Sequence, residues 1–223
     1  MTMTNNSLWF YLKTIFINPV AAAEGIRGEK NLWPLIAISS LLGMVPYWLI
    51  VLLGYSALGW GAFPYKQYYP YYFDPYWWEM LVVPVWAVVI ALGFSLPCYF
   101  LGKWLGGKAT FTQVLAVVML GSVVSLPFFV LVDLALYDPN QIIEFAKTGV
   151  AVHPNGMGEN WLVWFFQSSY AYFAMGWEGI VTIIGLTVIH RNRWYLNLPG
   201  IVAGNGIFML FLLSIRDYVA LII

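Results

Sequence analysis

Residues 111–136, FTQVLAVVMLGSVVSLPFFVLVDLAL, form an apolar run in which Asp133 is the single charged side chain. An α-helix rises about 1.5 Å per residue and the hydrocarbon core of a bilayer is about 30 Å thick, so about 20 such residues cross it. The run has 26 residues. It therefore predicts a membrane-spanning α-helix.

Four more segments are also long and apolar enough to cross the bilayer. They extend from Leu32 to Gly54, from Met80 to Leu101, within Trp161 to Ile189, and from Leu198 to Ile223. The whole chain of 223 residues is 61% hydrophobic and 9% charged, whereas soluble domains are about 45–50% apolar and about 25% charged. We predict an all-α, polytopic membrane helix bundle with five transmembrane helices, in which a cytoplasmic segment (1–31) precedes a five-span domain (32–223).

The N-terminal segment contains a predicted amphipathic helix. Its apolar positions follow the i, i+3, i+4 spacing of one helix face: Leu8, Tyr11, Leu12, Ile15 and Phe16. Lys13 and Thr14 lie on the opposite face, and Asn18-Pro19 ends the pattern. Such a helix is typical of segments that lie flat in the membrane interface.

The basic residues predict the orientation of the spans. Seven fall on one side of a five-span topology: Lys13, Arg27, Lys30, Lys103, Lys108, Arg191 and Arg193. The other side has only Lys66 and Lys147. Because short cytoplasmic loops carry an excess of Lys and Arg, we expect a cytoplasmic (inner) membrane protein with its N-terminus in the cytoplasm and its C-terminus outside.

Ionisable residues inside predicted spans are candidate functional residues, because each costs about 2.5–3.5 kcal/mol near the bilayer centre. Glu178 precedes Ile189 by eleven residues, which places it about 16 Å from the inner end of its span and close to the midplane. Gly176 and Gly179 flank it and could let a neighbouring backbone approach. Glu178 is interpreted either as a protonated packing residue or as a proton or cation site, and a helix broken at one of these glycines would instead expose it to water.

Asp133 and Arg216 fall towards the outer ends of the third and fifth spans. They share a depth, so they could pair and fix the helix register, or extend to the interface. Gly200 and Gly204 are four residues apart at the start of the fifth span. That spacing favours close helix–helix packing.

Enzyme motifs are absent from the sequence. It contains no Walker A sequence, G-x-G-x-x-G, H-E-x-x-H or G-x-S-x-G, each of which would indicate a known chemistry. His153 and His190 lie in predicted loops on opposite sides, so they cannot ligate a haem together. We predict a non-enzymatic protein with no catalytic residue, no metal and no cofactor, in which His190 belongs to a phospholipid-facing basic cluster with Arg191 and Arg193.

The charge balance also restricts the partners. The formal net charge is zero, so no basic field would attract nucleic acid. We expect the lipid bilayer, a second copy of the chain or other membrane proteins as partners. The aromatic run over residues 68–78 is interpreted as an interfacial belt or as a docking face, because Tyr and Trp are favoured at interfaces.

Several motifs occur in an order that resembles the Yip family of Rab-GTPase-interacting-protein-like membrane proteins. They are Asn18-Pro19, the charged patch from Glu24 to Lys30, LGKWLGGK (101–108), FTQVL (111–115) and SLPF (125–128). The resemblance is strongest from Leu81 onward and implies five spans with a cytoplasmic N-terminus. The long N-terminal region of eukaryotic members has no counterpart here, so a Rab contact is not carried over. The chain resembles a short prokaryotic member, which implies a role in membrane organisation or transport.

Three hypotheses follow. The first is a Yip-like membrane protein that acts through helix-mediated association, with itself or within a larger assembly. The second is a small transporter or channel subunit that uses Glu178 as a midplane carboxylate site. The third is an accessory subunit of a membrane enzyme complex, docked through the aromatic loop.

Overall fold

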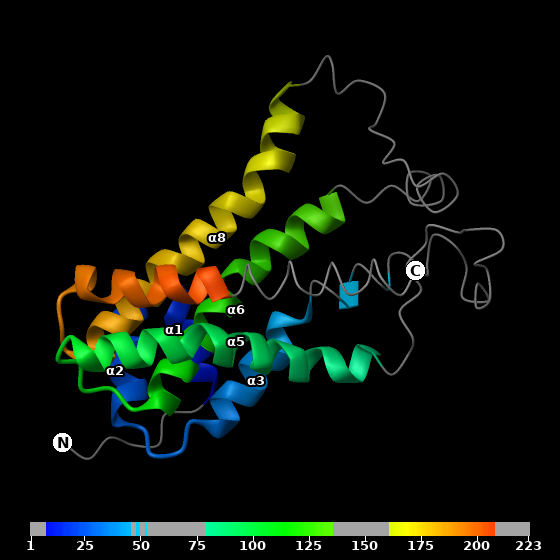
Figure 1. Cartoon of the computed structure of the whole chain (residues 1–223). Coiled ribbons are helices and arrows are strands. Elements are labelled where there is room, and N and C mark those ends of the chain that lie inside the picture. Colours follow the sequence, from blue (N-terminus) through cyan, green and yellow to red (C-terminus); the bar gives the residue numbers. More distant parts are fainter. Residues whose placement is uncertain (1–7, 46–47, 50–51, 53–78, 136–160, 208–223) are drawn as a thin grey trace, which may run out of the picture. The chain divides into compact units, whose positions relative to one another are not determined.

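A computed structural model describes residues 8–45, 48–49, 52, 79–135 and 161–207. Every regular element in these residues is a helix (Figure 1). The α-helices are α1 (Leu8–Ile17), α2 (Pro19–Gly28), α3 (Trp33–Gly43), α5 (Glu79–Trp104), α6 (Phe111–Ala135) and α8 (Trp161–His190). A 3-10 helix, η2 (Trp194–Asn197), leads into a helical segment over residues 198–207.

The chain divides into two compact units. The first comprises Met1–Gly43, Pro84–Val124 and Trp177–Ile223, and the second comprises Met44–Val83 and Ser125–Gly176. The buried core described below belongs to the first unit. It includes the helices of the N-terminal segment together with parts of α5, α6 and α8.

Short polar motifs explain where the helices begin. Asn18 caps α2 by accepting a hydrogen bond at 3.0 Å from the backbone N–H of Ala21, and Pro19 occupies the first turn, where its missing N–H costs nothing. At α6, Thr110 and Gln113 form a capping box. The Gln113 N–H donates to the Thr110 hydroxyl at 3.3 Å, and the Thr110 N–H donates to the Gln113 side chain at 2.9 Å.

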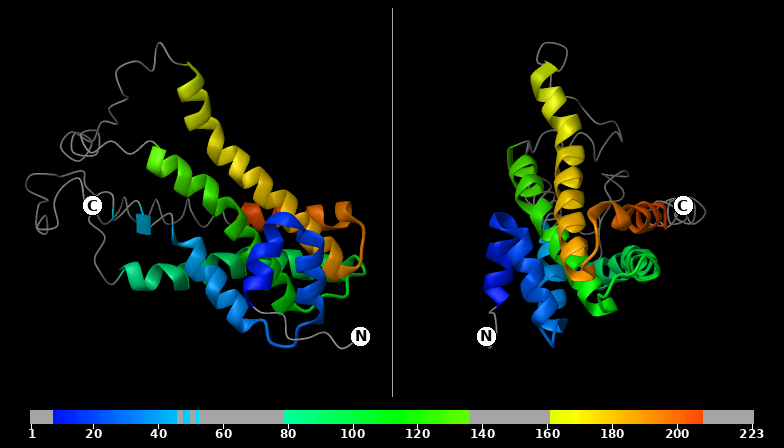
Figure 2. Two further views of the ribbon diagram at one scale, coloured as in Figure 1. Left: turned by 180° about the vertical axis from the view of Figure 1, so that it is seen from behind. Right: turned by 90° about the vertical axis from the view of Figure 1, so that its left-hand side faces the viewer.

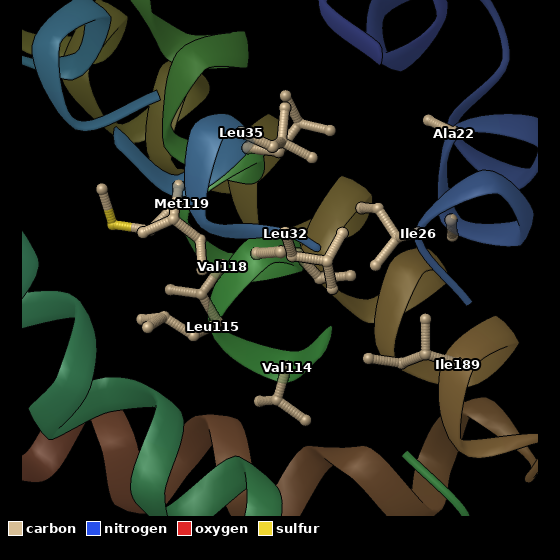
Figure 3. Close-up of a cluster of buried hydrophobic side chains, with 14 of the residues drawn as sticks. Ala22, Ile26, Leu32, Leu35, Val114, Leu115, Val118, Met119 and Ile189 are labelled. Atoms are coloured by element: carbon tan, nitrogen blue, oxygen red, sulfur yellow. The ribbon is translucent and has the colours of Figure 1, made fainter. Parts of the chain in front are cut away.

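α6 is the central helix of the first unit. Its residues from Val114 to Gly121 are all buried, and they contact α2, α3 and α8 through the side chains drawn in Figure 3. Ile26, Leu115 and Ile189 lie in this cluster. Within the unit, the views of Figure 2 place α1 to α3 on one side of α6 and α8, and α5 with residues 198–207 on the other.

α5 is apolar on two opposite faces. One face is buried and made of small residues: Ala91, Ser95, Cys98 and Gly102. The other carries Val85, Val89, Leu96 and Phe100, whose side chains are between 42% and 63% exposed. The spacing of 4, 7 and 4 residues keeps these four side chains, the α5 stripe, on one face over about 22 Å of helix.

The structure adds detail to the predicted N-terminal helix. The amphipathic helix is present as α1, but Tyr11 and Ile15 are buried in the core of the first unit, whereas Leu8 and Phe16 are exposed. Asn18-Pro19 ends α1 and at once begins α2, a helix that the sequence analysis did not predict. The cap at Asn18 with Pro at the first helical position was the signal for it.

The predicted spans correspond to helices of different lengths. The segment 80–101 lies in α5, 111–136 matches α6 and 161–189 lies in α8. α3 ends at Gly43. In the rest of the predicted span, residues 45, 48, 49 and 52 are helical, and residues 46–47, 50–51 and 53–54 lie outside the described residues. One helix in the described part of the chain, over Phe111–Phe128, is long and apolar enough to cross a membrane. The buried core helix of a water-soluble protein has the same length and composition.

Candidate functional site

The predicted intramembrane ionisable residues are described to different extents. Glu178 lies in α8 and is partly buried. The backbone of α6 contains Asp133, but its side chain is outside the described residues, and Arg216 lies wholly outside them. The proposed Asp133–Arg216 pair is therefore still a prediction, as is the role of Glu178.

The glycines beside Glu178 make no close approach to another helix within the described part of the chain. No described atom lies within 4 Å of a Cβ built on Gly176 or Gly179. The close approach between α6 and α8 occurs further along, where a Cβ on Gly121 would lie 2.5 Å from the Thr182 hydroxyl and one on Gly185 would lie 2.5 Å from Val117.

Gly200 and Gly204 face α5 of the same chain. A Cβ on Gly200 would lie 2.8 Å from Cys98 Cα, and one on Gly204 would lie 2.9 Å from the Phe94 carbonyl oxygen. Both atoms belong to the backbone, so neither can move aside cheaply. This glycine pair allows the helical segment 198–207 to pack directly on the α5 backbone.

Two turns of the chain meet at the end of α5 and α8. The first (103–110) follows α5, and its Gly106 has φ of +85°. Gly106 N–H bonds to the Lys103 carbonyl at 3.0 Å and Gly107 N–H to the Gly102 carbonyl at 2.8 Å, which is the Schellman pattern of helix ends. The second turn (190–197) follows α8. Its Arg191 also has a left-handed φ of 55°, and Asn192 N–H bonds to the Thr187 carbonyl at 3.4 Å.

His190 joins these two turns. Its carbonyl oxygen accepts a hydrogen bond from Lys108 N–H at 3.1 Å. Its imidazole lies against Gly102 and Gly107, since a Cβ on Gly102 would come within 2.6 Å of Nε2 and one on Gly107 would overlap Nδ1. Only glycine at these two positions leaves room for the ring.

The environment of His190 favours its neutral form. The side chain is fully buried, and neither ring nitrogen has a hydrogen-bond partner in the described part of the protein. Burial first, and then the positive charge of Lys103, lowers the pKa of His190 from 6.5 to about 4. His190 lies one residue beyond the predicted fourth span. His190 was predicted to belong to a phospholipid-facing basic cluster with Arg191 and Arg193, but the structure buries its ring and leaves only the two arginines exposed.

An amide network holds the second turn in place. Asn197 is buried and its amide donates to Thr187 Oγ1 at 3.2 Å and to Asn192 Oδ1 at 3.0 Å. Asn192 donates back to Asn197 at 3.3 Å. The network could not be predicted from the sequence, because Thr187, Asn192 and Asn197 come within hydrogen-bond distance only when the chain turns after α8.

The two joined turns differ from a metal centre in their side chains. The described residues contain no group of three or more His, Cys, Asp or Glu side chains that could hold a metal ion. They do contain exposed cations and aromatic side chains gathered at the two joined turns.

No protein-family model, curated protein or solved structure matches this chain. The fold and the site thus define an all-helical protein with a candidate membrane span. The resemblance to the Yip family stays a prediction.

Proposed function

We propose that this protein is a Yip-like, non-enzymatic integral membrane protein that spans the bilayer five times and acts in membrane organisation, as a helix-packing component of a membrane assembly. The α5 stripe is the observation that carries this proposal. Leaving a large apolar side chain exposed to water forgoes the free energy that burial of its surface would contribute. Four of them in line along a helix whose opposite face is already buried require lipid or another apolar helix.

The interior of the first unit supports the same proposal. Ser39, Ser95 and Thr182 are buried between helices, and glycines at the contacts bring backbones together. Membrane helices associate through small and weakly polar residues of this kind, because lipid already satisfies their large apolar side chains. On α5, small residues line the buried face and large apolar residues the exposed one, which is the arrangement expected of a helix packed within a bundle in lipid.

Photocrosslinking from the α5 stripe tests the proposal. A photoreactive amino acid at Leu96, in protein produced in its native membrane, should give adducts with a defined membrane protein or with a second copy of the chain. The same amino acid at Trp104, which is 81% exposed and lies beyond the stripe, is the control. Lipid adducts alone from Val89, Leu96 and Phe100 would contradict a role in an assembly.

The transporter and enzyme-subunit hypotheses predict different results, each in its own assay. A transporter that uses Glu178 would move ions or protons in liposomes, and Glu178→Gln would abolish the flux. An accessory enzyme subunit would retain an enzyme on purification in gentle detergent. If the flux depended on Glu178 and the α5 stripe gave no protein adducts, the transporter hypothesis would replace our proposal.

A further inference from the structure

The two turns joined by His190 form one surface, the basic turn pair (residues 103–110 and 190–197). The Lys108 N–H to His190 carbonyl bond and the contact of the His190 ring with Gly107 bring them together. In Figure 1 the loop between α5 and α6 and the loop after α8 lie at the same end of the first unit.

The basic turn pair has a strong and unbalanced charge. Lys103, Lys108, Arg191 and Arg193 are all exposed, and neither turn contains an acidic residue. The chain as a whole is neutral, so this is a local concentration of positive charge and not a property of the protein's overall field.

Exposed aromatic side chains occur in the same two turns as these cations. Trp104, Trp194 and Tyr195 are exposed, and the Arg193 guanidinium donates a hydrogen bond to the Tyr195 hydroxyl at 3.0 Å. Exposed Trp and Tyr next to Lys and Arg are typical of the level of lipid headgroups, where the ring contacts acyl chains and the polar edge stays hydrated.

The backbone that carries the cations is fixed. Both helices end in closed hydrogen-bonded turns, and the Asn192–Asn197 pair holds the second one. The buried His190 ring lies between them and fixes their separation. A site whose charges are already in position loses less conformational entropy on binding than one formed by flexible loops.

We propose that the basic turn pair binds the phosphate headgroup of an anionic glycerophospholipid in the adjacent leaflet. Lys103, Lys108, Arg191 and Arg193 neutralise the headgroup, and Trp104 and Trp194 contact the glycerol and upper acyl region. The inference rests on the proposed membrane location, which places this surface at the cytoplasmic leaflet, but it does not depend on an assembly partner. Charge complementarity selects an anionic lipid over a zwitterionic one.

Native mass spectrometry of the full-length protein in a neutral detergent tests the proposal. Phosphatidylglycerol and phosphatidylcholine with the same acyl chains are titrated separately, and inorganic phosphate is added as a competitor. The variants are Lys103→Gln with Lys108→Gln, and Arg191→Gln with Arg193→Gln. The matched control is Lys13→Gln with Lys30→Gln, which removes two exposed cations outside the basic turn pair.

We expect phosphatidylglycerol to bind more tightly than phosphatidylcholine. Each double variant in the turns should weaken the affinity for phosphatidylglycerol about thirtyfold, or roughly fivefold per cation removed. The control pair should change the affinity by less than about threefold, since the charges that bind lie elsewhere. Because glutamine replaces exposed side chains, both variants should keep the wild-type circular dichroism spectrum. If one variant misfolds, the other decides the result.

Three outcomes would overturn the proposal. Equal binding of the two lipids would show that headgroup charge is not recognised. An equal loss in the Lys13 and Lys30 control would show that general charge, and not this surface, attracts the lipid. Complete displacement of phosphatidylglycerol by millimolar inorganic phosphate would show that the surface is a site for free anions and not for a lipid. Protein adducts from the α5 stripe could persist in each case, so failure here would leave the proposed function standing.

Discussion

His190 is a neutral imidazole held where water does not reach it. A buried ring nitrogen without a partner costs about 1–3 kcal/mol, and the glycines at positions 102 and 107 leave no space for a side chain that could provide one. The ring nevertheless fills the gap between two turns, and its backbone carbonyl is bonded to Lys108. The protein therefore retains the imidazole for its shape and position, at a cost that depends on pH.

The pH dependence of stability tests this account of His190. The pKa is lowered from 6.5 to about 4, so between these values the unfolded chain binds more protons than the folded one. The stabilising effect of the neutral ring is complete above pH 6.5 and is lost as the pH falls towards 4, by roughly 3 kcal/mol. Thermal unfolding in detergent at pH 7 and pH 4 should show this loss.

Three variants separate His190 from other titrating groups. His190→Leu, of similar volume, should lack most of the pH-dependent loss, and Lys103→Gln should reduce it because the repulsive charge is gone. His153→Leu removes the other histidine of the chain and should behave like the wild type. If His153→Leu removed the pH dependence and His190→Leu kept it, the assignment to His190 would be wrong.

At the scale of elements, polar side chains at the helix ends determine how the helices connect. Gln113 caps α6 and its amide also donates to the Arg27 carbonyl at the end of α2, at 3.0 Å. One residue of the FTQVL motif thus ties two helices that are 86 positions apart in sequence. Asn18 has the corresponding role at the start of α2. Asn18-Pro19 and FTQVL, two of the motifs that resemble the Yip family, thus cap and connect helices in this chain.

The glycine pair of the last helical segment allows a sharp test of helix packing. Gly200→Ala and Gly204→Ala should each destabilise the protein by about 1–3 kcal/mol, because the new methyl group meets the α5 backbone. Gly206→Ala is the control. No described atom lies within 4 Å of a Cβ there, and alanine is the better helix former by up to about 1 kcal/mol.

Thermal unfolding and size-exclusion chromatography of the three variants give the measurement. Loss of stability at 200 and 204 with no change in oligomer size would assign the glycine face to packing within the chain. Equal stability of all three variants would contradict the close contact with α5. A smaller oligomer at unchanged stability would instead assign the glycine pair to association between two copies of the chain.

The helices themselves were largely predictable, but their contacts were not. Apolar length predicted α5, α6 and most of α8, because a long run without charge has few alternatives to a helix. α2 was missed because Asn18-Pro19 was interpreted only as the end of the preceding helix, although Asn followed by Pro is also a helix start signal. The burial of His190 could not be predicted, since it depends on Gly102 and Gly107, more than 80 residues earlier in the sequence.

At the scale of the whole molecule, the composition and the α5 stripe favour the same environment. A chain that is 61% hydrophobic has more apolar surface than one core can cover, and α5 presents part of that surface outward. α6 alone is less informative, because its buried residues from Val114 to Gly121 would suit the core of a water-soluble protein equally well. The exposed α5 stripe is the feature that favours a membrane protein over a water-soluble one.

The most direct test of the account is the location of the two ends of the chain across the membrane. An epitope tag at each end of the full-length protein, in cells with an intact inner membrane exposed to protease, reports which end is accessible from outside. Five spans and the distribution of basic residues predict a C-terminal tag that is cleaved at once and an N-terminal tag that is cleaved only after permeabilisation. Cleavage of both tags from the same side, or recovery of the protein from the soluble fraction without detergent, would contradict a five-span membrane protein.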